Sequence, residues 1–319
     1  MGQLPAARIQ PARPFLRVGI DFCGPFNCKP RIRSKAIFKT YVCVFLCFAT
    51  KAVHMEIVND LTTDAFLAAL RRFVARRGRC TDIFSDNATN FVGGNRALQE
   101  LYELFQNTEH QEIVQRFCAN EGITWHMIPP NSPHFGGLWE SAVKAAKHHM
   151  RRALGTASFT TEELGTVVTQ IEACLNSRPL SPMSSDPSDL EPLTSGHFLI
   201  GAPLNSIIEP DLTELKLNRL SRWQLIQRTV QEFWRRWSNE YLSELQSLKK
   251  WTTVQPNIQP GSMVLLKEDN VPPMKWLLGR IVETFPGRDG LTRVVSVRTA
   301  HGTYKRSITK TCILPMDND

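Results

Sequence analysis

The sequence predicts an α/β protein in which a mixed β-sheet flanked by helices is followed by a helix and a small SH3-like β-barrel. The first half alternates short apolar, strand-like runs with segments whose apolar residues recur every three or four positions, as on one face of a helix. After Gly261 the pattern changes to short strands joined by glycine-rich turns. The 319 residues, 42% hydrophobic and 21% charged, are enough for two folded domains.

The first predicted domain occupies residues 15–200 and follows a flexible tail, residues 1–14, that contains Pro and Arg. Its first helix opens at Thr62-Thr63-Asp64, a typical capping sequence. A later helix is capped through Thr160 or Thr161. We expect strands at residues 16–22, 40–48, 52–57, 82–85 and 123–128, and helices at 62–77, 93–105, 109–121, 138–154 and 161–176.

A loop rich in Pro, Ser and Gly is expected over residues 129–137, before the helix at 138–154. Pro129-Pro130 stiffens the start of this loop, and Gly136-Gly137 leaves its end free to move. A loop that is fixed at one end and hinged at the other can close over a bound substrate, although a surface turn could have the same composition.

The second predicted domain, residues 219–317, follows an irregular connection over 177–218, of which 201–218 is the linker. It opens with a helix at 219–248 that carries an aromatic stripe, which we interpret as core or subunit interface rather than a surface that stacks on bases. The stripe contains Trp223, Ile226, Val230, Phe233, Trp237, Tyr241 and Leu245. The barrel strands are expected at 263–267, 277–285, 292–299, 302–307 and 312–314.

The sequence argues against several classes of protein. Its longest apolar stretch, residues 41–48, is far too short to span a bilayer, and the N-terminal region has no apolar run of signal-peptide length. The eight cysteines show neither a disulfide framework nor the spacing of zinc ligands, so we interpret them as buried thiols in a reducing compartment. We therefore expect no zinc site, no membrane partner and no secretion.

Positive charge is concentrated in the last third of the chain. The net charge is +8 overall, but residues 219–319 contribute +7 and residues 1–218 only +1. A basic module beside a nearly neutral domain suits a protein that grips a phosphate backbone with one part and carries out chemistry with the other. A soluble basic domain without a nucleic-acid partner is the alternative.

Three carboxylates stand where a predicted strand ends or a helix begins. Asp21 and Asp86 each follow an apolar run, and Glu140 comes soon after Gly136-Gly137, which predicts a position in the first turn of a helix. Singly, these acids could start a turn, cap a helix or complement a helix dipole. Together, their oxygen ligands suit Mg²⁺ or Mn²⁺, and two such ions can activate an attacking oxygen and stabilise a leaving one in phosphoryl transfer.

The helix at 138–154 extends this argument, because its polar residues fall on one face. They are Glu140, Lys144, Lys147, His148 and Arg151. Cations that follow a metal-binding acid along its own face would hold DNA phosphates over the site, although an ordinary solvated face is the alternative. The opposite face is apolar and suited to packing on the sheet, with Leu138, Ala142, Ala145, Ala146 and Met150.

Five sequence motifs follow one another along nearly the whole chain. They are Gly19-Ile-Asp-Phe-Cys-Gly-Pro-Phe26, Ser85-Asp-Asn-Ala-Thr-Asn-Phe91, Ile128-Pro-Pro-Asn-Ser-Pro-His-Phe-Gly-Gly-Leu-Trp-Glu140, Leu175-Asn-Ser-Arg-Pro-Leu180, and a final set that includes Trp223-Gln-Leu-Ile-Gln-Arg228 and Phe233-Trp-Arg-Arg-Trp237. In this order they resemble the integrases of retroelements, and most closely those of Bel-Pao retrotransposons.

The resemblance implies a ribonuclease-H-like catalytic core with two Mg²⁺ or Mn²⁺ ions, in which Asp21 bridges both ions while Asp86 and Glu140 each serve one. It implies 3′-end processing by water and strand transfer by a DNA 3′-hydroxyl, so no protein nucleophile is needed. The implied partners are double-stranded DNA, as element ends and target, and further copies of the chain; the implied locations are nucleus and cytoplasm. The candidate DNA contacts are Asn87, Thr89, Asn90, Lys144, Lys147 and Arg151.

The sequence departs from the family pattern at three points. It begins at Met1-Gly-Gln-Leu-Pro without an N-terminal zinc-binding segment, from which we expect poor assembly for paired insertion of two DNA ends. Ala88 stands where such enzymes often carry Gly. The gap between Asp86 and Glu140 is longer than in retroviral integrases, which makes Glu121 a rival; we keep Glu140 because Glu121 precedes a strand.

Two other functions compete with the integrase interpretation. One is a domesticated, non-catalytic DNA-binding protein derived from an integrase; the intact acidic triad argues against it, whereas the missing zinc segment argues for it. The other is a ribonuclease-H-type nuclease that acts on RNA–DNA hybrids, against which the basic C-terminal barrel argues.

Overall fold

The computed structural model describes residues 10–86, 107–128, 133–155, 157–184, 186–216, 219–246 and 257–315, with the backbone alone at 86, 127–128 and 133–143. The chain forms two compact units, Met1–Leu175 and Asn176–Asp319. The helix predicted at 93–105 lies outside the described residues. Among the helices in the described ranges, none is long and apolar enough to cross a membrane.

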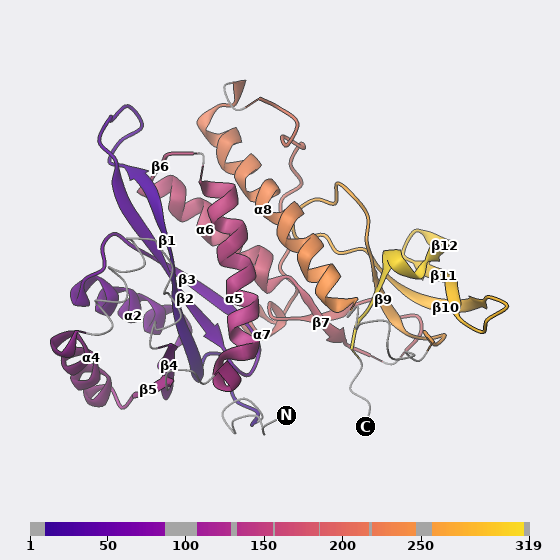
Figure 1. The fold of residues 1–319 in the computed structure, drawn as a ribbon, viewed down its shortest axis with the longest axis horizontal. Helices are drawn as coiled ribbons and strands as arrows, with labels where there is room; N and C mark the ends of the chain where they lie inside the picture. Colours follow the sequence, from indigo (N-terminus) through magenta and orange to yellow (C-terminus); the bar gives the residue numbers. More distant parts are fainter. Residues whose placement is uncertain are drawn as a thin grey trace. The chain divides into compact units, whose positions relative to one another are not determined.

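A mixed β-sheet forms the centre of the first unit (Figure 1). In it, β2 pairs antiparallel with both β1 and β3, whereas β4 lies parallel to β1 and β5 parallel to β4, in the order β3-β2-β1-β4-β5. The strands are β1 (Arg17–Lys29), β2 (Phe38–Cys47), β3 (Val53–Val58), β4 (Asp82–Asp86), β5 (Thr124–Ile128) and the short β6 (Phe159–Thr160), which pairs with the end of β1. The predicted mixed sheet is confirmed.

Of the helices described in this unit, α2, α4 and α6 begin within one residue of their predicted positions, whereas α5 begins five residues earlier than predicted. These helices are α2 (Thr63–Arg77), α4 (Thr108–Asn120), α5 (Pro133–Leu154) and α6 (Thr161–Asn176). Thr62 caps α2 by accepting the N–H of Ala65. Thr160 and Glu163 form the predicted capping box at α6, since each side chain accepts the other residue's backbone N–H.

Helices α2 and α5 lie on opposite faces of the sheet. Side chains alternate between the faces along a strand. On β1, Phe22 packs against Phe66 of α2, with 6.2 Å between ring centroids. The flanking residues Asp21 and Cys23 instead contact Lys147 of α5. One face of β1 therefore builds the α2 core and the other receives α5.

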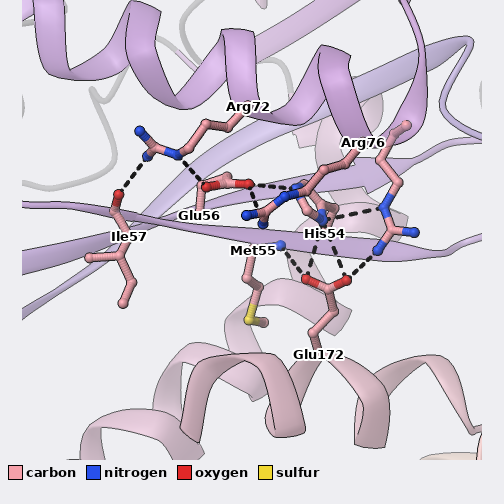
Figure 2. A network of polar contacts seen from close by, with 8 residues as sticks. His54, Met55, Glu56, Ile57, Arg72, Arg76 and Glu172 are labelled. Atoms are coloured by element: carbon pink, nitrogen blue, oxygen red, sulfur yellow. Dashed lines mark hydrogen bonds and ion pairs between the residues drawn. The ribbon is translucent and has the colours of Figure 1, made fainter. Parts of the chain in front are cut away.

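A partly buried cluster of charged residues joins β3 to helices α2 and α6 (Figure 2). His54 hydrogen-bonds Glu56 at 2.9 Å and Glu172 at 3.3 Å, and the arginines of α2 complete the pairs. Burial alone would lower the pKa of His54, but its hydrogen bonds to Glu172 and Glu56 outweigh burial and raise the pKa. Burial opposes ionisation of Glu56 too, yet hydrogen bonds from His54 and Arg72 hold its pKa below the ordinary value. The cluster thus holds charged groups of both signs at the edge of the sheet.

The second unit contains an antiparallel five-stranded sheet in the order β12-β11-β10-β9-β13. Its elements are β7 (Pro179–Pro182), β8 (Pro192–Thr194), α7 (His197–Ile200), α8 (Arg222–Leu245), β9 (Met263–Leu266), β10 (Leu278–Pro286), β11 (Thr292–Thr299), β12 (Gly302–Ser307), the 3₁₀ turn Ile308–Lys310 and β13 (Thr311–Ile313). Alternation along β9 divides the core, because Met263 and Leu265 pack with Leu242 of α8 whereas Val264 and Leu266 pack with β10 and β11.

Helix α8 buries most of the predicted aromatic stripe. Phe233 and Trp237 are buried and stack with 6.1 Å between ring centroids. Trp234, which the pattern omitted, is also buried, and its indole N–H donates to the carbonyl of Val271 at 2.9 Å. Trp223 is the exception: it lies in the first turn of α8 and is 54% exposed, so it is not part of this core, and its place in a subunit interface stays a prediction.

Helix α5 corrects two predictions about the segment before Glu140. The helix begins at Pro133, so residues 133–137 are helical rather than part of a loop, and Gly136-Gly137 is not a hinge at the loop's end. Glu140 consequently lies beyond the first turn of the helix. The physical reason is that proline is well accommodated at the first position of a helix, where its missing N–H has no intrahelical partner.

The region predicted as an irregular connection contains the β7–β8 hairpin and α7. The buried guanidinium of Arg280 on β10 holds the hairpin's loop by donating to the carbonyls of Ser184 and Asp189 at 2.6 and 2.9 Å. This hairpin belongs to the second compact unit, which begins at Asn176, whereas the sequence placed the end of the first domain at residue 200. A hairpin held by a residue almost one hundred positions away leaves no local signal.

Candidate active site beside the pairing of β1 and β4

Strand register places Asp21 and Asp86 next to each other on neighbouring parallel strands. Ile20 of β1 pairs with Ser85 of β4, and the two acids are the next residue on each strand. Strand β1 continues to Lys29 through its pairing with β2, so Asp21 lies inside the strand, and the prediction that this strand ends at residue 22 is wrong. Because parallel strands point the same way, both acids lie at the same end of this pairing. The structure thus brings together two residues that are far apart in the sequence.

Asp21 lies in a partly buried environment between β1 and α5. Its side chain is 20% exposed. One carboxylate oxygen, Oδ1, accepts the backbone N–H of Phe22 at 2.7 Å, and the other, Oδ2, accepts the ammonium group of Lys147. The carboxylate is therefore oriented by one backbone donor and neutralised by one cation.

The packing of α5 on the sheet explains why Lys147 contacts Asp21. Ala145, Ala146 and Met150 are buried, as the predicted apolar face requires. Lys147 lies at the edge of this face, and its side chain is 13% exposed. One turn later, Arg151 donates to the backbone carbonyl of Gly24 at 3.2 Å, which ties the next part of the helix to β1.

Glu140 lies on α5 two turns before Lys147. Seven helical positions bring the backbone almost back to the same face, so Glu140 and Lys147 share a helix face, about 10 Å apart along the axis. Of the other predicted DNA contacts, Lys144 and Arg151 are exposed on α5. Asn87, Thr89 and Asn90 lie outside the described residues.

The cysteines near the acids have raised thiol pKa values. All eight cysteines are free and buried, as predicted. Burial raises the pKa of the Cys23 thiol to about 11, even though Lys147 and Arg151 lower it. Burial also raises the pKa of Cys43, with the charge of Asp21 adding to the effect. Both thiols stay protonated at neutral pH, when the thiolate would be the reactive form.

The ligand chemistry of this position fits a hard divalent cation. Carboxylate oxygens are the ligands that Mg²⁺ and Mn²⁺ prefer, and the two acids directly follow the last paired residues of β1 and β4, Ile20 and Ser85. Among side chains in the described ranges, no cluster of three or more His, Cys, Asp or Glu residues is arranged to hold a metal ion. Asp86 and Glu140 are placed by their backbone only.

Sequence reasoning missed two features. It assigned Lys147 to a DNA phosphate contact and did not foresee the pairing of Lys147 with Asp21. The available sequence signal was the position of Lys147 two helical turns after Glu140, on the helix face that was expected to lie at the site. Sequence reasoning also missed the charged cluster around His54. The alternation His54-x-Glu56 on a strand and the arginines of α2 were the available signals, because residues two apart on a strand share a face.

A separate cavity of about 260 Å³ lies in the second unit, between α8 and the segment before β10. Trp234 and Trp276 line it, together with the acidic residues Glu209, Asp211 and Glu268. None of the predicted site residues lines this cavity, so it is not part of the site described above.

Comparisons with known proteins give limited matches. The family described as "Family of unknown function (DUF5641)" matches residues 221–314, which span α8 to β13. No curated protein matches the chain.

The solved structures that are similar to the chain include a retroviral intasome and a retroviral integrase core. The simian T-cell lymphotropic virus intasome in complex with PP2A regulatory subunit B56 gamma shares 10% identity, over 97% of this chain and 85% of that chain, with a TM-score of 0.35. The HTLV-2 integrase catalytic core domain in complex with magnesium, in dimeric form, shares 18% identity, over 54% of this chain and 92% of that chain, with a TM-score of 0.32. At these TM-scores the likeness carries no argument about function.

Proposed function

We propose that the chain is the catalytic and C-terminal part of a retroelement integrase of Bel-Pao type, which trims DNA 3′-ends and joins them to target DNA. The observation that carries this proposal is the register of β1 and β4, which brings Asp21 and Asp86 together beneath the helix that bears Glu140. The strand order β3-β2-β1-β4-β5 supports a ribonuclease-H-like core for the first unit. The five ordered sequence motifs support the family.

In this proposal Asp21, Asp86 and Glu140 hold two Mg²⁺ or Mn²⁺ ions. When bound, the ions would activate the attacking oxygen of water or a DNA 3′-hydroxyl and stabilise the leaving oxygen. The chain's own contribution is to fix the ligands: the N–H of Phe22 orients the Asp21 carboxylate, and the sheet sets its spacing from Asp86. No protein nucleophile takes part, in keeping with the protonated thiols of Cys23 and Cys43.

The second unit would grip the DNA backbone through a small SH3-like barrel. Residues 219–319 of this unit carry a net charge of +7, and basic residues lie on its outer strands. On β12, Lys305 is exposed and its ammonium lies 4.4 Å from the centre of the Phe285 ring, while Arg306 lies over the exposed ring of Tyr304. Cations mixed with aromatic rings suit contact with phosphates and bases. We propose double-stranded DNA and further copies of the chain as partners, with action in the nucleus after synthesis in the cytoplasm.

The test is metal-dependent joining of duplex oligonucleotides taken from the element's own ends. Asp21→Asn, Asp86→Asn and Glu140→Gln should each abolish nicking and joining in Mn²⁺ while leaving metal-free DNA binding intact, because each removes a charged ligand but not the fold. Glu121→Gln is the matched control and should keep activity. Retained joining by Asp86→Asn would show that the active site lies elsewhere.

A non-catalytic DNA-binding protein with the same fold is the second candidate. The pairing of Lys147 with Asp21 favours it, since a neutralised carboxylate is a poorer metal ligand. DNA binding with no Mn²⁺-dependent product in the same assay would select this candidate. Cleavage of an RNA–DNA hybrid in preference to duplex DNA would instead identify a ribonuclease-H-type nuclease.

A further inference from the structure

Lys147 forms an ion pair with the residue that the proposed function requires as a metal ligand. Its Nζ atom donates to Oδ2 of Asp21, and both side chains are mostly buried. A lysine ammonium is a compact, monovalent point charge on a flexible four-carbon chain. At this position it binds one of the oxygens that a divalent ion would bind.

The backbone of Lys147 contacts the sheet, and the residue lies beside an exposed part of α5. The Lys147 carbonyl lies 3.9 Å from Sγ of Cys23, and Arg151 is bound to Gly24 on the same strand. One turn earlier, Lys144 is exposed, so this face of α5 reaches solvent near the ion pair. Rotation of its four-carbon side chain toward Lys144 would separate Lys147 from Asp21 without a movement of the helix.

We propose that Lys147 is a resident counter-ion that a divalent cation displaces from Asp21, and that the released ammonium then binds a DNA phosphate beside the metal. This inference rests on the proposed function, because it needs Asp21 as a metal ligand. In the absence of metal, the pair holds the Asp21 carboxylate in place and offsets a negative charge that would repel DNA.

The exchange couples metal binding to DNA binding. Metal and DNA both favour the state in which Lys147 has left Asp21, so each ligand increases the affinity for the other by the same factor. A ligand that binds only the released state has its apparent affinity reduced by the fraction of molecules in that state. If the pair is closed in about nine molecules of ten, removing Lys147 should strengthen metal binding about tenfold.

The first experiment measures Mn²⁺ binding to the full chain without DNA, by titration of the free-ion electron paramagnetic resonance signal. We expect Lys147→Gln to bind Mn²⁺ about tenfold more tightly than the wild type, because the competing cation is gone. Lys147→Arg keeps the cation and should bind like the wild type. Lys144→Gln removes a cation one turn away and should also bind like the wild type.

The second experiment measures DNA affinity by fluorescence anisotropy with and without Mn²⁺. Mn²⁺ should tighten DNA binding about tenfold in the wild type, and Lys147→Gln should lose most of this gain. Lys144→Gln should weaken DNA binding by a similar factor in both conditions. Equal far-ultraviolet circular dichroism of all variants confirms the fold.

The outcomes separate this inference from the proposed function. If Asp21→Asn leaves Mn²⁺ binding unchanged, the metal site is elsewhere and the proposed function fails. If Asp21→Asn abolishes binding but Lys147→Gln binds Mn²⁺ no more tightly than the wild type, the metal site stands and the counter-ion inference is overturned. Should Lys147→Gln not fold, Lys147→Met is tested in its place, and wild-type Mn²⁺ affinity in that variant overturns the inference equally.

Discussion

From the charged cluster around His54 we predict how much stability the substitution Glu172→Gln removes. Glu172 accepts the N–H of Met55 at 2.8 Å and pairs with His54 and Arg77, while its own side chain is 12% exposed (Figure 2). Glutamine keeps the shape and one acceptor but removes the charge that both cations share. Removing one partner of a buried ion pair costs about 3–5 kcal/mol, and we expect about 3 kcal/mol because Arg77 is partly exposed and regains water.

The assay for Glu172→Gln is thermal unfolding followed by circular dichroism. A loss of about 3 kcal/mol lowers the melting temperature of a unit of this size by about 6–12 °C. Glu162→Gln is the matched control, because Glu162 is exposed on the same helix and its substitution should change stability by less than about 0.5 kcal/mol. A shift as small as that of the control would show that the cluster does not hold α6 to β3, and the reasoning would be refuted.

Four further predictions concern pH, packing and salt. The pKa of His54 is higher in the folded than in the unfolded protein. Its charge therefore stabilises the fold fully at a pH below the unfolded-state pKa, and this stabilisation is lost as the pH rises through the folded-state pKa. The melting temperature should fall above about pH 6.5 in the wild type but much less in His54→Gln. The pKa of Glu56 is lower in the folded than in the unfolded protein, so its contribution to stability is present at a pH above the unfolded-state pKa and is lost as the pH falls through the folded-state pKa. Glu56→Gln should therefore reduce the fall in melting temperature at acidic pH. Trp237→Ala should destabilise the second unit by about 3–5 kcal/mol in urea unfolding, because it empties the buried stripe of α8. Joint substitution of Lys305 and Arg306 by Gln should reduce the slope of log affinity against log salt for duplex DNA by about 2, and an unchanged slope would exclude this surface from the DNA contact.

Local patterns were enough to predict most strands and helices. The alternation and the apolar runs gave β11 and β12 at their observed residues, and Thr62, Thr160 and Glu163 predicted helix starts because capping is a contact between near neighbours. The buried face of α5 was predicted correctly at Ala145, Ala146 and Met150, because the helical spacing of apolar residues determines which face is buried.

Long-range contacts could not be predicted in this way. The β7–β8 hairpin depends on Arg280, and the charged cluster depends on Glu172 meeting a strand more than one hundred positions earlier. The start of α5 was predicted too late because Pro133 was taken as part of a loop. Proline is typical of loops, but it also occupies the first position of helices, as it does here. Of the site, the sequence predicted the acids, and the strand pairing added that Asp21 and Asp86 are neighbours.

The most direct test of the central claim is a crystal structure of the full chain soaked with Mn²⁺, with anomalous difference maps that locate the metal. We expect two peaks beside the pairing of β1 and β4, within about 2.0–2.3 Å of carboxylate oxygens from Asp21, Asp86 and Glu140. At saturating Mn²⁺, maps without a peak at these three carboxylates would contradict the claim that they form a metal-dependent active site.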